Sequence, residues 1–297
     1  QKIKRLEPAP RGVYCGAVGV VRPGDDGGIV ATFNVPIRTA ELAGQQLRCG
    51  IGSGLVAGAQ ADAEWAEWAA KRAFIEQAAA PFALLETLAL EEGVLRNGAQ
   101  HLARLQQSAA HWRYDWNAAQ VQERVAALVQ AHPTGVWRVR LVLDSSGDLQ
   151  AEAYPLAASP RKVLLALATR PMAAAHSDWV RYKTTRRAHY AAFAPAAGGP
   201  VWDTVLYNSA QEITESTFGN IAMELDGEWV TPPLHCGLLP GVGRALALQQ
   251  CRVRERVVCL HDLPRITGWA FINSLRGWID AELETPSPAV LQSLGQR

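Results

Sequence analysis

The sequence predicts an α/β fold of the mixed α+β kind, divided into more than one domain. Its 297 residues suffice for about two domains of ordinary size, and a hydrophobic content of 48% supports real cores. Strand patterns alternate with helical patterns along the chain. The segment "PLAASPR" (155–161) contains two prolines and is the best candidate for an interdomain linker.

The first half begins with a strand and a glycine-rich stretch. Residues 27–35 form the strand, after a "GDDGG" turn, and "RCGIGSGLVAG" then ends at Gly58. Residues 61–80 are rich in helix formers and Pro81 closes them, which predicts a helix. Asn97 is placed as the N-cap of a further helix. The other elements predicted here are a strand at 82–90, a helix at 118–131 and a hairpin of 136–143 with 149–154.

The second half reads as another α/β arrangement. "KVLLALAT" (162–169) opens it as a strand. Residues 220–233 predict a hairpin that turns at Asp226 and Gly227. "PGVGRALALQQC" reads as a loop that leads into a helix. Further short strands are predicted at 204–208, 253–258 and 270–274.

Charge and cysteine content exclude several classes of protein. A net charge of +1 gives no electrostatic reason to expect nucleic acid or a membrane as partner. No run approaches the roughly 18 apolar residues of a spanning helix, and no signal-peptide pattern opens the chain. The five cysteines are scattered without a C-x-x-C pair, so a cytoplasmic location is expected. Because the chain starts at Gln1 without methionine, we expect a fragment of a longer protein.

Lysine is rare, and one lysine stands in an unusual setting. Only five of the 29 basic residues are lysine, and Lys183 lies in "YKTTRR" beside Arg186 and Arg187, whose positive charges would favour its neutral amine if they point at it. A lysine amine can form a Schiff base with a carbonyl cofactor and later act as a base. If the cofactor is pyridoxal phosphate, a carboxylate must hold the pyridine nitrogen protonated. Backbone N–H groups at a helix start and an arginine should bind the phosphate.

Each requirement has a candidate. Glu215 lies in "ITESTFGNI", in a tight context between strands. Val242 and Gly243 lie in "GLLPGVGRAL", where a glycine-bracketed loop feeds a helix and could aim N–H groups at an anion. Arg104, in "HLARL", sits on an amphipathic helix and could reach inward, and Ser274, in "NSLRG", follows a strand.

The four spaced motifs together resemble the fold-type IV family of pyridoxal-phosphate enzymes, over about residues 82–280. This family includes branched-chain aminotransferases, D-amino-acid transaminases and aminodeoxychorismate lyases. The resemblance implies that Lys183 carries the cofactor and that Glu215 pairs with its pyridine nitrogen. It also implies that Arg104, Val242, Gly243 and Ser274 hold the phosphate, and that Thr87 is a contact on the substrate side. One departure is Gly243, where many members have threonine.

The first 75 residues carry a separate pattern. Glu64, Glu67 and Lys71 are spaced at i, i+3 and i+7, on one face of a helix. Two carboxylates on adjacent turns can hold Mg²⁺, and Arg38 could grip a substrate carboxylate. The "GIGSG" backbone could approach an anion closely.

This set resembles the C-terminal end of chorismate-binding enzymes: anthranilate, isochorismate and aminodeoxychorismate synthases. The resemblance implies that Tyr14, Arg38, Gly52 and Gly54 contact chorismate. It further implies that Glu64 and Glu67 bind Mg²⁺, with Lys71 nearby. Because only the tail of that domain matches, residues 1–75 are expected to be inactive as a synthase.

Both resemblances together imply a fusion of aminodeoxychorismate synthase component I with aminodeoxychorismate lyase. The expected domains are 1–75, a chorismate-binding fragment; 76–157, a small domain; and 158–297, a large cofactor-binding domain. The expected reaction is cleavage of 4-amino-4-deoxychorismate to 4-aminobenzoate and pyruvate, on the route to folate. The expected partners are a second copy of the chain and a glutamine amidotransferase subunit. Two alternatives stay open: a branched-chain or D-amino-acid aminotransferase, and a catalytically inert truncated scaffold.

Overall fold

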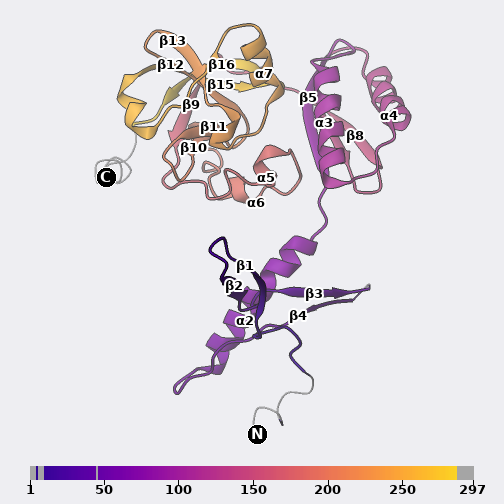
Figure 1. Ribbon diagram of the computed structural model, residues 1–297. Coiled ribbons are helices and arrows are strands. Elements are labelled where there is room, and N and C mark those ends of the chain that lie inside the picture. The colour runs from indigo at the N-terminus through magenta and orange to yellow at the C-terminus, as the bar shows by residue number, and fades with distance from the viewer. Residues whose placement is uncertain (1–4, 6–9, 45, 286–297) are drawn as a thin grey trace. The chain divides into compact units, whose positions relative to one another are not determined.

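The computed structural model describes residue 5, residues 10–44 and residues 46–285 (Figure 1). The chain divides into two compact units, Gln1–Pro81 and Phe82–Arg297. Helix α2 (Ala61–Ala79) matches the predicted helix closely and runs through residue 75, so the division between the units follows its end. None of the helices described has the length and apolar character that crossing a bilayer requires.

The first unit consists of two hairpins and α2. Its strands are β1 (Val18–Pro23) with β2 (Ile29–Asn34), and β3 (Ala40–Ala43) with β4 (Gln46–Cys49). Strand β2 is the predicted strand at 27–35. Every residue of β1 and β2 is exposed, although several are large and apolar. These two strands therefore contribute no buried side chain to a core.

The second unit begins with an antiparallel sheet in the order β6-β5-β7-β8. Helices α3 and α4 pack on β5 and β8 and cover a core of leucine and valine side chains (Figure 1). All the elements predicted for this region are confirmed. Their bounds are β5 (Leu84–Glu91), β6 (Val94–Leu95), α3 (Gly98–Trp112), α4 (Ala118–Ala131), β7 (Val136–Leu143) and β8 (Leu149–Pro155).

The same unit contains an eight-stranded mixed sheet in the order β11-β10-β9-β16-β15-β12-β13-β14. Its predicted strands and the predicted hairpin turn at Asp226 are confirmed, whereas β11 and β16 were not predicted. The bounds are β9 (Lys162–Leu167), β10 (Val201–Tyr207), β11 (Ile213–Ser216), β12 (Asn220–Leu225), β13 (Glu228–Thr231), β14 (Arg254–Glu255), β15 (Ile266–Asn273) and β16 (Gly277–Leu283). The helices are α5 (Asp178–Arg181), α6 (Ala188–Ala191), α7 (Val242–Gln249) and the 3-10 turns η1 (Leu234–Cys236) and η2 (Leu260–Arg265).

The small sheet has two chemically different faces. Successive strand residues point to opposite sides, so Leu84 and Leu88 are buried in the core while Thr87 lines a cavity on the other face. On β7, Arg138 and Arg140 follow the same alternation and line that cavity, with Arg140 directly opposite Thr87. Strand periodicity therefore places polar groups toward the cavity.

Asn97 corrects one expectation about capping. It precedes α3 in the left-handed conformation, with φ of 57°, and its side chain caps no helix N–H. Its Nδ2 instead donates to Ser274 Oγ at 3.1 Å. The side chain that was expected to stabilise its own helix thus joins α3 to a loop of the large sheet.

Candidate active site

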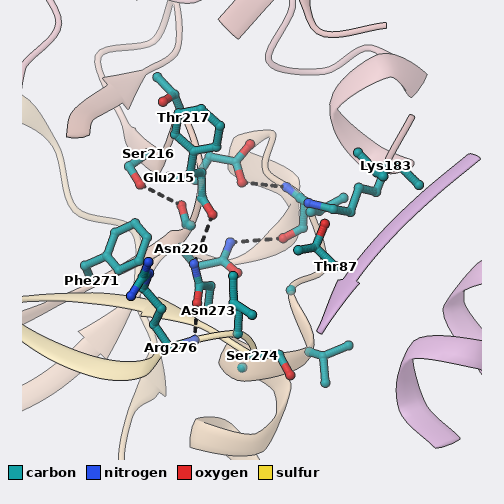
Figure 2. Close-up of a pocket in the computed structure, with 18 of the residues that line it drawn as sticks. Thr87, Lys183, Glu215, Ser216, Thr217, Asn220, Phe271, Asn273, Ser274 and Arg276 are labelled. Carbon is teal, nitrogen blue, oxygen red and sulfur yellow. Dashed lines mark hydrogen bonds between the residues drawn. The ribbon is translucent and has the colours of Figure 1, made fainter. Parts of the chain in front are cut away.

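A cavity of about 500 Å³ lies in the second unit, where the small and large sheets meet. All the residues predicted for the cofactor site line it, together with the predicted substrate contact. Figure 2 shows the side chains of Lys183 and Glu215 directed toward the same space. These lining residues are Lys183, Glu215, Arg104, Val242, Gly243, Ser274 and Thr87.

The segment that carries Lys183 continues the small sheet. The Leu85 N–H donates to Lys183 O at 3.0 Å, and the Thr185 N–H donates to Ala83 O at 2.9 Å. Thr184 is buried and pairs with Leu84 across this short antiparallel bridge. Backbone hydrogen bonds of Lys183 and Thr185, on either side of Thr184, therefore fix the position from which the Lys183 side chain enters the cavity.

The amine of Lys183 is shifted toward its neutral form. Burial lowers its pKa from 10.5 to about 8, and the positive charges of Arg187 and Arg104 act in the same direction. Sequence reasoning had named Arg186 and Arg187 as the neighbours that could have this effect. Arg187 has it, whereas Arg186 lies over the Trp179 ring at 4.4 Å from its centroid.

Glu215 is buried at the floor of the cavity. Its Oε1 accepts from the Tyr190 hydroxyl at 2.6 Å, and its Oε2 accepts from the Leu239 N–H at 3.1 Å. Burial raises the pKa of Glu215 to about 7, although these two hydrogen bonds act in the opposite direction. Each oxygen keeps further acceptor capacity, so the carboxylate can pair with a ring N–H.

Arg104 is held by a second buried carboxylate, which the sequence had not revealed. Its Nε and Nη2 donate to the two oxygens of Glu86 at 2.8 and 2.6 Å, and its Nη1 donates to Pro240 O at 3.0 Å. His101 Nδ1 also lies 2.6 Å from Glu86 Oε2. Burial alone would raise the pKa of Glu86, but Arg104 and His101 lower it to about 2. Three of the five guanidinium N–H groups are thereby used, which leaves two for an anion.

The start of α7 and the loop after β15 form an anion cradle. Gly241 precedes α7 without a side-chain cap, so the N–H groups of Val242 and Gly243 are available there. A Cβ on Gly243 would lie 2.8 Å from the carbonyl carbon of Asn273, and one on Gly241 would lie 1.9 Å from Asn220 Oδ1. Glycine is required because the 273–274 backbone approaches so closely, and this approach brings Ser274 beside the helix start.

Several residues that line or support the site were missed. Tyr190, seven residues after Lys183, was given no role, because its hydroxyl contact with Glu215 is a tertiary one. Asp203 is fully buried and accepts hydrogen bonds from Thr217 and from the Phe218 N–H, which holds the loop after Glu215. His101 stands three residues before Arg104, and this spacing on one helical face was the available signal.

The first unit brings together only part of the predicted chorismate set. The Tyr14 ring lies against the glycine loop, since a Cβ on Gly52 would be 2.9 Å from its hydroxyl. Arg38 is exposed, and nothing lies within 4 Å of the Cβ position of Gly54. The contacts of these residues with chorismate stay predictions.

The predicted Mg²⁺ ligands have protein partners. Glu64 accepts from Ser53 Oγ, while Glu67 pairs with Lys71 at 2.5 Å. Lys71 Nζ also donates to Gly52 O at 2.9 Å. Lys71, expected near these carboxylates, pairs with Glu67, and the role of the carboxylates as Mg²⁺ ligands stays a prediction.

Comparison with known proteins identifies the family of both regions. Residues 83–282, more than half of the chain, match the family described as amino-transferase class IV. The chain belongs to this family. Residues 1–77 match the family described as chorismate binding enzyme. Both resemblances deduced from the motifs are confirmed.

Individual relatives of this class IV protein differ in the reaction their names give. It is 30% identical over 177 residues to the "Putative aminodeoxychorismate lyase" of Schizosaccharomyces pombe, covering 58% of this chain and 75% of that one. It is 33% identical to a "Putative amino-acid aminotransferase" of Mesorhizobium loti, with a TM-score of 0.64 over 68% of this chain and 100% of that one. The 4-amino-4-deoxychorismate lyase of Pseudomonas aeruginosa shares the fold, with a TM-score of 0.58, 20% identity and coverage of 72% and 89%.

The residues of the cavity fit the cofactor on which fold-type IV enzymes depend, pyridoxal phosphate. A lysine with a lowered pKa, a buried carboxylate and a glycine-lined anion cradle are present in one cavity. One buried atom, His101 Nε2, has no hydrogen-bond partner among the described residues. An anionic group in the cradle would suit this donor set.

Proposed function

We propose that this protein cleaves 4-amino-4-deoxychorismate to 4-aminobenzoate and pyruvate, as the lyase part of a synthase–lyase fusion in folate synthesis. The observation that carries the proposal is that one chain contains a region of the chorismate-binding family and a region of the class IV family. A synthase of the first family can make the substrate that a lyase of the second consumes. The named lyases among the relatives support this pairing.

Cleavage of aminodeoxychorismate needs a base that removes a proton from the substrate and a site that binds the cofactor. When bound, pyridoxal phosphate supplies an aldehyde for the substrate amine and a ring that accepts an electron pair. Glu215 would accept a hydrogen bond from the cofactor ring nitrogen, and Arg104 with the N–H groups of Val242 and Gly243 would bind the phosphate. The neutral Nζ of Lys183 removes the proton from the substrate carbon that bears the amine.

Lys183 then holds the proton that the departing group requires. The bond between the ring carbon and the enolpyruvyl oxygen breaks, and the enolpyruvyl group leaves. Return of one proton to its methylene carbon gives pyruvate, and the ring becomes aromatic. The two products contain all the atoms of the substrate, so the reaction consumes neither water nor an oxidant.

The charge of the cavity supports an acidic substrate. Arg138, Arg140 and Arg276 line it, Arg140 lies directly opposite Thr87, and the substrate carries two carboxylates. Arg140 pairs with Glu152 at 3.3 Å, but both side chains are exposed and such pairs exchange partners at little cost. We place Thr87 and Arg140 as contacts of the substrate.

The test is an assay of the purified protein with pyridoxal phosphate and aminodeoxychorismate. We expect 4-aminobenzoate and pyruvate to form in equal amounts. Lys183→Ala should abolish product, while Lys162→Ala should retain it, because Lys162 is an exposed residue that pairs with Glu282. Failure of the wild-type protein to form 4-aminobenzoate, with cofactor bound at Lys183, would reject the lyase assignment.

An aminotransferase is the second candidate, favoured by the 33% identity to the Mesorhizobium loti protein. It would use the same cofactor residues and differ only in the return of the amine from a keto acid. Incubation with branched-chain or D-amino acids and 2-oxoglutarate distinguishes the two. Glutamate formation without 4-aminobenzoate would establish the aminotransferase.

The proposal extends to partners and to the first unit. We propose a homodimer, testable by light scattering, and supply of ammonia by a glutamine amidotransferase. In the chorismate-binding region, Tyr14 and Arg38 would contact chorismate, and Glu64 and Glu67 would bind Mg²⁺. Calorimetry with chorismate and Mg²⁺ tests these assignments, and absence of binding by a chain that contains the whole synthase region would reject them.

A further inference from the structure

His101 lies on the face of α3 that meets the anion cradle. Asn97, His101 and Arg104 are spaced at i, i+4 and i+7, which places them on one helical face. The first donates to Ser274 Oγ and the third to Pro240 O. Both flanking residues therefore contact the two loops that form the cradle, and His101 lies between them.

The ring of His101 is held at one nitrogen and open at the other. Only 1% of the residue is exposed, and Nδ1 lies 2.6 Å from Glu86 Oε2. Because the pKa of Glu86 is lowered to about 2, this carboxylate can only accept, so Nδ1 carries the shared hydrogen. The opposite atom, Nε2, is buried and has no hydrogen-bond partner among the described residues.

His101 is one of the residues that line the cavity, while Glu86 is not among the described lining residues. Nδ1 is occupied by Glu86, so the ring edge with Nε2 is the one left for a group bound in the cavity. Buried polar atoms in proteins are almost always hydrogen-bonded, so a ligand group at this edge is expected.

We propose that His101 is a binding residue for the cofactor phosphate, with Nε2–H donating to a phosphate oxygen beside Arg104. With Nδ1–H directed at Glu86, Nε2 carries a hydrogen only in the imidazolium form. Glu86 thus serves both cations that hold the anion. The proposal goes beyond the proposed function, since it applies equally to lyase and aminotransferase.

The test compares two substitutions of His101, each of which retains a hydrogen-bond donor near one of the two ring nitrogens. His101→Asn retains a donor near the Nδ1 position, whereas His101→Gln retains one near the Nε2 position. Affinity is measured by equilibrium titration for pyridoxal phosphate and for pyridoxal, which lacks the phosphate. We expect His101→Asn to weaken pyridoxal phosphate binding by about 10- to 100-fold, the range for a hydrogen bond to a charged group, with little effect on pyridoxal. His101→Gln should retain most of the affinity.

A structural role alone would give a different result. Equal losses for pyridoxal phosphate and pyridoxal, or a larger loss for His101→Gln than for His101→Asn, would overturn the proposal. His261→Gln is the control, because the side chain of His261 is 77% exposed. A second measurement avoids substitution: ¹⁵N NMR of the imidazole in the wild-type protein should show both nitrogens protonated with pyridoxal phosphate bound. A neutral ring in that complex would also overturn the proposal.

Discussion

The lowered pKa of Lys183 leads to a quantitative prediction about how fast the protein captures aldehydes. Only the neutral amine attacks a carbonyl. With a pKa of about 8, about one amine in ten is neutral at pH 7, whereas at the ordinary 10.5 the fraction is about one in 3,000. The cavity should therefore accelerate capture at pH 7 by about 300-fold relative to an exposed lysine.

The assay follows capture by cofactor-free protein between pH 6 and 11. An uncharged aldehyde, trapped at Lys183 by borohydride, avoids the titrations of pyridoxal phosphate itself. The rate should rise with pH and reach half its maximum near pH 8. Arg187→Met removes the like charge that lowers this pKa most, so the midpoint should move to higher pH. Each full pH unit of that movement lowers the rate at pH 7 about tenfold.

Arg186→Met is the matched control for this experiment. Its guanidinium lies over the Trp179 and Phe82 rings, and we expect a smaller change in the midpoint than for Arg187→Met. A wild-type midpoint near 10.5 would refute the reasoning, since it would mean that water solvates the amine fully. Equal movement in both arginine variants would refute the specific role of Arg187.

Two further predictions concern the residues around the cradle. Glu86→Gln leaves the Arg104 guanidinium and the His101 ring without the carboxylate that they share, and it should cost about 3–5 kcal/mol of stability in urea unfolding. Because the pKa of Glu86 falls from 4.5 to about 2 on folding, its contribution to stability is complete above pH 4.5 and is lost toward pH 2. The wild-type protein should therefore lose more stability over this range than the variant. Gly243→Ala places a methyl group 2.8 Å from the Asn273 carbonyl carbon, so it should destabilise the protein by about 1–3 kcal/mol and weaken cofactor binding, whereas the exposed Ala245→Ser on the same helix should do neither.

Local chemistry explains which parts of the fold could be predicted. Helix α4 was predicted at its observed bounds because Asn117 accepts from the Gln120 N–H and the apolar residues recur at helical spacing. Strand β16 was missed because its place is set by distant partners. It pairs in parallel with β9, so Lys162 lies beside Asp280, and no local pattern encodes that pairing.

The same distinction applies to the site. Lys183, Glu215 and Arg104 were predicted because the short motifs that contain them follow one another in the order typical of the fold-type IV family. Glu86 was missed because a lone glutamate in an alternating strand reads as a surface residue. Glu86 lies on the face of β5 that packs against α3. There it contacts His101 and Arg104, which are 15 and 18 residues away in sequence. Asn97 was misassigned for a related reason, since the contact with Ser274 outweighs its local preference for capping.

The two buried carboxylates of the site have opposite pKa shifts, and their partners explain why. Glu86 receives a bidentate arginine and an imidazole, which keep it ionised at any physiological pH. Glu215 receives a phenol and one backbone N–H, neither of which carries charge, and burial then raises its pKa to about 7. A carboxyl group near neutrality can share a proton with a ring nitrogen, whereas one with a pKa near 2 can only neutralise cations. The geometry thus separates one carboxylate that would support phosphate binding from another that would share a proton with the cofactor.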